Sequence, residues 1–257
     1  MQNRTRAGER LIDRRQWLRL AGGAALMGPR KAAPPNVLIV LADQFPAYAT
    51  GYAGDSHAKT PNLDRLAREG TRFINAISNC PVCTPYRAML QTGRWPLTTG
   101  MIANDIRLPE GEYTLGEAFR DARYQTGYIG KWHLDGPARW AFPPPGARRQ
   151  GYQFWAASNC HHNYTNAFYY RDTPERIPVQ GYEPIRQTEL FLEFLRGRDK
   201  SRPFFMQLSW GPPHPPYHLI PQELRIFRPE QMQPRPNARN PNLQFLSDFY
   251  SHIAALD

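Results

Sequence analysis

Six consecutive apolar residues near the start of the chain constrain the fold more than any other feature. The run from Val37 to Ala42 is rich in β-branched residues and shows no alternation of polar and apolar positions. Such a run is typical of a strand buried on both faces, as in the parallel sheets of α/β proteins. The segments Tyr124–Ile129 and Phe204–Trp210 also have the composition of strands. We therefore expect an α/β fold with a mostly parallel sheet.

Helical patterns alternate with these strands along the chain, which is the order typical of α/β folds. Thr114 and Glu117 form a capping-box pattern. Thr60-Pro61 and Thr84-Pro85 open two more helices, because proline is favoured in the first helical turn, and Gly70 and Gly93 stop them. Apolar residues recur at helical spacing in the helix that Thr60-Pro61 opens and in two further predicted helices: Leu63, Leu66, Ala67, Leu190, Phe191, Phe194, Leu195, Leu243, Leu246, Tyr250, Ile253 and Leu256.

The formal charge of +10 is concentrated at the N-terminus, where residues 1–31 hold eight basic and two acidic residues. The later basic residues are scattered, so we expect no nucleic-acid binding. The segment Asp13–Leu18 contains Arg14-Arg15 and resembles a twin-arginine export signal. A weakly apolar stretch, Leu20 to Met27, follows it and is too short to span a bilayer. We expect residues 1–33 to be a removable export segment and the protein to be periplasmic or secreted.

Polar residues follow the predicted strands in a regular way. Asp43-Gln44 comes directly after the first strand, Lys131 and His133 follow the second, and His214 follows the third. Ligands of open α/β sheets bind beyond the carboxyl ends of the strands, so we expect these side chains to converge on one pocket.

Cys83 lies just before a predicted helix, in the segment Cys80-Pro81-Val82-Cys83-Thr84-Pro85-Tyr86-Arg87. Cys80 and Cys83 have the spacing of a redox pair or of half a zinc site, but no second half-site exists, because Cys160 stands alone. A helix N-terminus exposes unpaired N–H groups and favours an anion. Arg87, one turn further, adds charge-assisted hydrogen bonds.

The Cys-x-Pro-x-Arg spacing that begins at Cys83 resembles the signature of the sulfatase family. Four further segments resemble sulfatase sequence and occur in the family's order: Pro35–Gln44, Thr60–Leu66, Gly130–Leu134 and Pro213–Tyr217. The resemblance therefore runs from about Asn36 to the last residue given. The resemblance implies an alkaline-phosphatase-like three-layer α/β sandwich.

The resemblance also implies a mechanism. Cys83 would be oxidised to formylglycine by a separate formylglycine-generating enzyme, and its hydrate would attack the sulfur of a sulfate ester. Asp43 and Gln44 would bind Ca²⁺ or Mg²⁺ together with the Cys83 product, although many members have Asp where Gln44 stands. Lys131 and His133 would hold the sulfate and the diol. The resemblance assigns protonation of the leaving alcohol to His214, and the position of Arg87 one turn into the helix suits it to orient the diol.

Two alternatives stay open. A phosphonate or phosphate ester hydrolase of the same superfamily can use the same nucleophile, and an inactive remnant would bind anions without turnover. The substrate alcohol, a small molecule or a carbohydrate, is not readable, and His161, His162 and Asn163 stay unassigned. Because the resemblance implies further metal ligands and strands after the last helix, we expect residues 34–257 to be a catalytic domain whose C-terminal part is missing, with little turnover.

Overall fold

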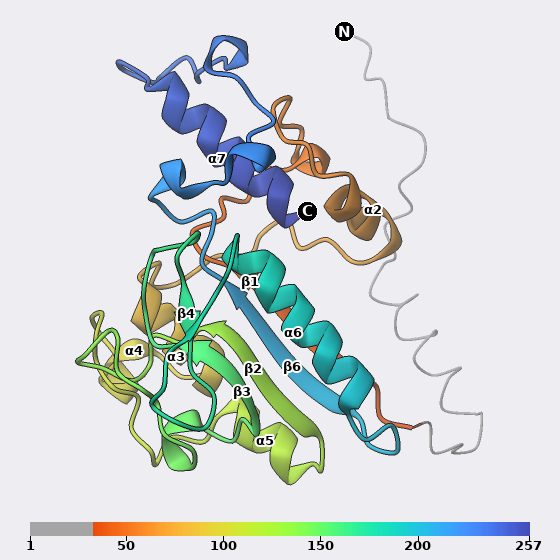
Figure 1. The fold of residues 1–257 in the computed structure, drawn as a ribbon, viewed down its shortest axis with the longest axis vertical. Coiled ribbons are helices and arrows are strands. Elements are labelled where there is room, and N and C mark those ends of the chain that lie inside the picture. The colour runs from red at the N-terminus through yellow and green to blue at the C-terminus, as the bar shows by residue number, and fades with distance from the viewer. Residues whose placement is uncertain (1–32) are drawn as a thin grey trace, which may run out of the picture. The chain divides into compact units, whose positions relative to one another are not determined.

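Four strands form a parallel sheet in the unit of residues 36–257 (Figure 1). The computed structural model describes residues 33–257, so the predicted twin-arginine motif lies outside the described residues. The strands are β1 (Val37–Ala42), β2 (Gln125–Lys131), β3 (Phe154–Ser158) and β6 (Phe204–Trp210), in the order β1-β6-β2-β3. All three strand pairs are parallel, so the carboxyl ends share one edge of the sheet.

Helices cover both faces of this sheet. The helices α3 (Cys83–Thr92) and α5 (Leu115–Asp121) contribute Ala88, Leu115 and Phe119 to the core on one face. The helix α6 (Glu183–Gly197) packs on the other face and runs along the sheet in Figure 1. The predicted α/β fold with a parallel sheet between helices is therefore confirmed.

The remaining elements lie outside the central sheet and carry much of the loop structure. A separate antiparallel pair is formed by two short strands. The helix at the C-terminal end packs on 3₁₀ turns that precede it. These elements are α2 (Pro61–Glu69), α4 (Pro96–Thr99), α7 (Leu243–Leu256), β4 (Phe168–Tyr169), β5 (Ile177–Pro178), and the 3₁₀ turns η1 (Gly51–Ala53), η2 (Ala147–Arg149), η3 (Tyr217–Leu219), η4 (Gln222–Leu224) and η5 (Pro229–Gln231).

The local signals in the sequence place most helix ends well. Thr114 and Glu117 form the predicted capping box of α5, and Gly93 ends α3 with a φ of 66°. Two element boundaries differ from the predicted ones by one or two residues. Cys83 is the first residue of α3, because Val82 takes the N-cap, and Lys131 is the last residue of β2 instead of a loop residue.

Two predictions of burial are wrong within the described residues. Leu38 and Val40 of β1 are 42% and 48% exposed, because β1 is an edge strand and one of its faces is left uncovered. Leu66 of α2 is 64% exposed, and no residue of that helix is buried. The helix is nevertheless anchored at its start, where Asn62 and Leu63 donate backbone hydrogen bonds to the Asp257 carboxylate.

Among residues 33–257, no helix has the length and apolar character needed to cross a membrane.

Candidate active site

Three of the predicted site residues meet at the carboxyl edge of the sheet. Asp43 directly follows β1, and its backbone N–H donates to the Trp210 carbonyl at the end of the neighbouring β6. Lys131, at the end of β2, places its Nζ 2.5 Å from Asp43 Oδ2 and 3.6 Å from Cys83 Sγ. Cys83 Sγ lies 3.9–4.0 Å from the Asp43 oxygens. A thiol, a carboxylate and an ammonium thus share one small volume.

Arg87 is fixed next to this cluster by partners from β2, from β6 and from Asp43 after β1. Its guanidinium donates to the Lys131 carbonyl at 2.6 Å and to Ser209 Oγ at 2.8 Å, and it lies 3.4 Å from Asp43 Oδ2. The Arg87 side chain is almost fully buried. Burial alone would raise the pKa of Asp43, but the adjacent Arg87 and Lys131 charges outweigh it and lower that pKa to about 2. Asp43 therefore stays ionised between its two cations.

The electrostatic surroundings favour an anion at Cys83. Burial raises the pKa of the Cys83 thiol, but the neighbouring His133 imidazole and Lys131 ammonium outweigh burial and lower it. The backbone adds to this effect, since Cys83 opens α3 and the first N–H groups of a helix have no partner within it.

His133 is held on its far side by a carboxylate. Its Nε2 lies 2.9 Å from Asp105 Oδ1, and Arg139 holds both Asp105 oxygens at 2.9–3.1 Å. The His133 backbone has a φ of 54°, a left-handed conformation that is uncommon outside glycine. Among the described residues, the buried His133 Nδ1 makes no hydrogen bond. An unpaired buried nitrogen next to Cys83 is available to a group bound there.

His214 reaches the same site through a proline-rich loop. Its Nδ1 donates to the Pro215 carbonyl at 2.6 Å, and the Tyr164 hydroxyl holds the His214 carbonyl at 2.8 Å. This arrangement leaves His214 Nε2 as the nitrogen that can exchange a proton with a ligand. Burial lowers the pKa of His214.

His162, which the sequence analysis left unassigned, belongs to this cluster. Its Nε2 lies 3.1 Å from Lys131 Nζ, and its ring stacks on His214 with centroids 4.2 Å apart. Burial, and then the Lys131 charge, lower the pKa of His162 to about 3, so the neutral ring accepts from the ammonium. His162 follows β3, a strand that the sequence analysis missed. The search for polar residues after a strand, which identified Asp43 and His214, would have identified His162 too had β3 been predicted.

Gln44 is the predicted site residue that the structure sets apart. It has a φ of 55°, and it lines both the cavity at Cys83 and a larger neighbouring cavity, without a hydrogen bond to the cluster. Asp43 and Gln44 offer two hard oxygen ligands, whereas Ca²⁺ takes six to eight. Within residues 33–257, no group of three or more His, Cys, Asp and Glu side chains could hold a metal ion. The residues present therefore make at most part of a metal site.

Comparison with known proteins decides the family. The Sulfatase family model matches residues 35–257, nearly all of the described chain. The chain belongs to the sulfatase family. This confirms the resemblance that rested on the Cys83 motif and its companions.

Individual relatives support the same family assignment. The chain is 41% identical over 231 residues to the ulvan-active sulfatase of Formosa agariphila, covering 87% of this chain and 45% of that protein. A solved Bacteroides fragilis structure that carries the sulfatase name superimposes with a TM-score of 0.80 at 28% identity, covering 90% of this chain and 58% of that one. The chain thus spans about half the length of these relatives.

Proposed function

We propose that this sulfatase hydrolyses sulfate esters at Cys83, after conversion of Cys83 to formylglycine. The observation that carries the proposal is the position of Cys83 Sγ, which lies 3.6 Å from Lys131 Nζ and about 4 Å from the Asp43 carboxylate at the start of a helix. An oxygen at that position would be flanked by a cation, a carboxylate and unpaired backbone N–H groups. The thiol stands there for the oxygen of the hydrated aldehyde.

Formylglycine would supply a hydrated aldehyde that attacks sulfur and later releases sulfate. The protein's own residues supply the rest. Lys131 and Arg87 offset the negative charge that develops on the sulfate oxygens. His133 Nε2 donates to Asp105, which leaves the Nδ1 lone pair to accept a proton from the nucleophile. His214 Nε2 donates a proton to the departing alcohol, and a bound anion favours its protonated form.

A divalent metal, Ca²⁺ or Mg²⁺, would be held in part by Asp43 and Gln44 at the end of β1. The remaining ligands would come from water or from other protein groups, because these two side chains supply too few oxygens. Formation of formylglycine requires a formylglycine-generating enzyme as a partner. We also propose export through Arg14-Arg15, which predicts that replacing both with lysine retains the protein in the cytoplasm.

The decisive experiment compares two cysteines three residues apart. The chain is produced with a formylglycine-generating enzyme, and peptide mass spectrometry locates the modification. Hydrolysis of matched aryl sulfate, phosphate and phosphonate esters is then measured for the wild type, Cys83→Ala and Cys80→Ala. We expect modification at Cys83 alone, preference for the sulfate ester, and loss of turnover only in Cys83→Ala. An unmodified Cys83, or full activity of Cys83→Ala, would refute the mechanism.

A further inference from the structure

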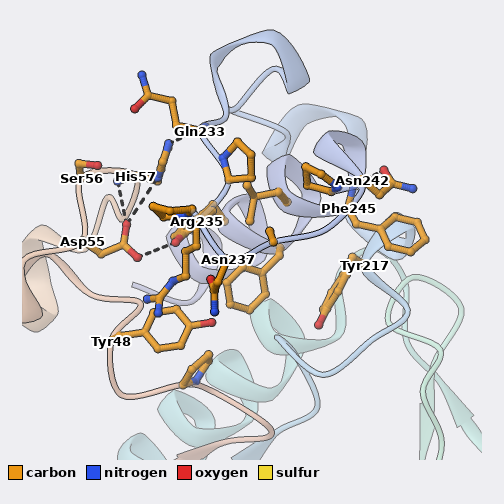
Figure 2. Close-up of a pocket in the computed structure, with 18 of the residues that line it drawn as sticks. Tyr48, Asp55, Ser56, His57, Tyr217, Gln233, Arg235, Asn237, Asn242 and Phe245 are labelled. Carbon is orange, nitrogen blue, oxygen red and sulfur yellow. Dashed lines mark hydrogen bonds and ion pairs between the residues drawn. The ribbon is translucent and has the colours of Figure 1, made fainter.

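A cavity of about 1070 Å³ adjoins the catalytic cavity and shares its wall. Gln44 and Phe45 line both the cavity that contains Asp43 and Cys83 and this larger one. Tyr217, three residues after His214, lines the larger cavity as well (Figure 2). The larger cavity is too big for a sulfate group alone and lies in the range of pockets that hold an organic ligand. A molecule with its sulfate at Cys83 can therefore extend past Gln44 and Phe45.

One cation in the wall of this cavity is available to a ligand. Arg235 lies over the face of Tyr48, with Cζ 3.6 Å from the ring centroid. Stacking uses the face of the guanidinium and leaves its N–H donors, which lie in its plane, free to bind an anion in a bidentate way. In the described chain no carboxylate pairs with Arg235, whereas arginines such as Arg87 and Arg225 do have one. Figure 2 shows Arg235 and Asn237 on the same side of the cavity as Tyr48.

The one carboxylate in the wall is already engaged. Asp55 accepts a 2.5 Å hydrogen bond from the Tyr250 hydroxyl and a 2.9 Å bond from the His57 backbone N–H. The His57 ring in turn accepts from the Gln233 backbone N–H at 3.1 Å, which ties this end of the cavity into the fold. The Asp55 carboxylate is thus engaged in hydrogen bonds within the wall, and Arg235 is the charged side chain that remains available to a ligand.

The rest of the lining suits a sugar. Phe245 is 54% exposed and Tyr217 packs edge-on against it, with centroids 6.3 Å apart. Flat aromatic surfaces beside polar groups such as Asn237 and Asn242 offer apolar contact together with hydrogen bonds. We propose that this cavity binds an anionic sugar unit next to the sulfated one, through Arg235, so that the substrate is an acidic oligosaccharide. The proposal deepens the proposed function and rests on it only for the position of the sulfate.

Binding of oligosaccharide probes to the chain with unmodified Cys83 tests the cavity without turnover. Calorimetry on the full chain would compare a glucuronate-containing tetrasaccharide, its carboxyl-reduced form, and the reduced form carrying one added sulfate. We expect at least one anionic probe to bind about 10- to 100-fold more tightly than the reduced probe. The anionic probe that binds more tightly tells whether the anion is a carboxylate or a second sulfate.

Variants assign this preference to Arg235. In Arg235→Gln the anionic and reduced probes should bind alike, and Arg235→Lys should keep only part of the difference, since it lacks the planar fork. Arg239→Gln, an exposed arginine four residues further that does not line the cavity, is the matched control and should bind as the wild type. Equal binding of charged and reduced probes, no binding of either, or an undiminished preference in Arg235→Gln would overturn the proposal. Aryl sulfate hydrolysis by the wild type reports the proposed function separately.

Discussion

Two neighbouring cavities of this protein differ in how their positively charged side chains are held. At Cys83, the Arg87 and Lys131 side chains are almost fully buried and fixed by carbonyl, hydroxyl and carboxylate partners. In the larger cavity, Arg235 is exposed and rests on the Tyr48 ring without a carboxylate partner among the described residues. Groups that are fixed before the ligand arrives suit chemistry, which depends on pre-organised charges. Exposed, adaptable groups suit recognition of a variable substrate.

The largest expected effect is on stability, and it separates the two arginines. Arg87→Met should lower the free energy of unfolding by about 3–5 kcal/mol, because it leaves the partly buried Asp43 with one cation fewer and the buried Ser209 and Lys131 carbonyl without a donor. Arg235→Met should change it by no more than about 0.5 kcal/mol, as is usual for an exposed side chain. Urea unfolding of both variants measures the contrast. Equal losses would break the distinction between the two cavities.

The sequence predicted one of these cavities and not the other. Asp43, Lys131 and His214 were found because each follows a strand of a parallel sheet, a placement that a local pattern reveals. The larger cavity is assembled from the loops around Tyr48, Asp55 and Arg235, the 3₁₀ turn at Tyr217 and the start of α7 at Phe245. Their meeting depends on tertiary packing, which no local rule encodes.

The exposure of individual side chains was the second property that the sequence did not predict. The composition of Val37–Ala42 correctly predicted a strand, but composition does not say which strand lies at the sheet edge, so the exposure of Leu38 and Val40 could not be foreseen. Asp105 was missed for a similar reason, since it follows no strand or helix and reaches His133 through a loop.

Asp105 provides a further test of the contrast between the two cavities, because its side chain is partly exposed yet hydrogen-bonds to the buried His133. Asp105→Asn should leave His133 without a fixed tautomer, and we expect kcat for an aryl sulfate to fall about 10- to 100-fold with little change in KM. Asp121→Asn, which removes an exposed carboxylate paired with Arg120 at the end of α5, is the control and should keep full activity. A loss of thermal stability that matches the loss of activity would instead indicate a structural role.

The last prediction concerns a buried carboxylate, Glu183, which differs from Asp43 in its partners. Glu183 is fully enclosed at the start of α6 and faces His161 Nε2 at 3.5 Å, with Gln187, Tyr164 and Tyr182 around it and Lys131 further away. Burial raises the pKa of Glu183 to about 8, and the Gln187 hydrogen bond and the Lys131 charge only partly oppose it. Burial also lowers the pKa of His161 to about 4. Both groups are therefore neutral in the folded protein near pH 6.

The sign of the pH dependence follows from these shifts. The folded pKa of Glu183 lies above its unfolded value of 4.5, so its contribution to stability is fully present below pH 4.5 and is lost as pH rises toward 8. His161 and His252, whose pKa values are both lowered from 6.5 to about 4, act in the opposite direction below pH 6.5 and mask the loss there. Glu183→Gln removes the Glu183 contribution and leaves the histidines. The unfolding free energy of the wild type should then fall relative to this variant with a limiting slope of about 1.4 kcal/mol per pH unit between pH 4.5 and 8, because the histidine contributions cancel in the comparison. Urea unfolding at pH 5, 6.5 and 8 measures this difference. Parallel curves for the two proteins would mean that Glu183 is ionised in the folded state, and that an ion pair with His161 sets its charge.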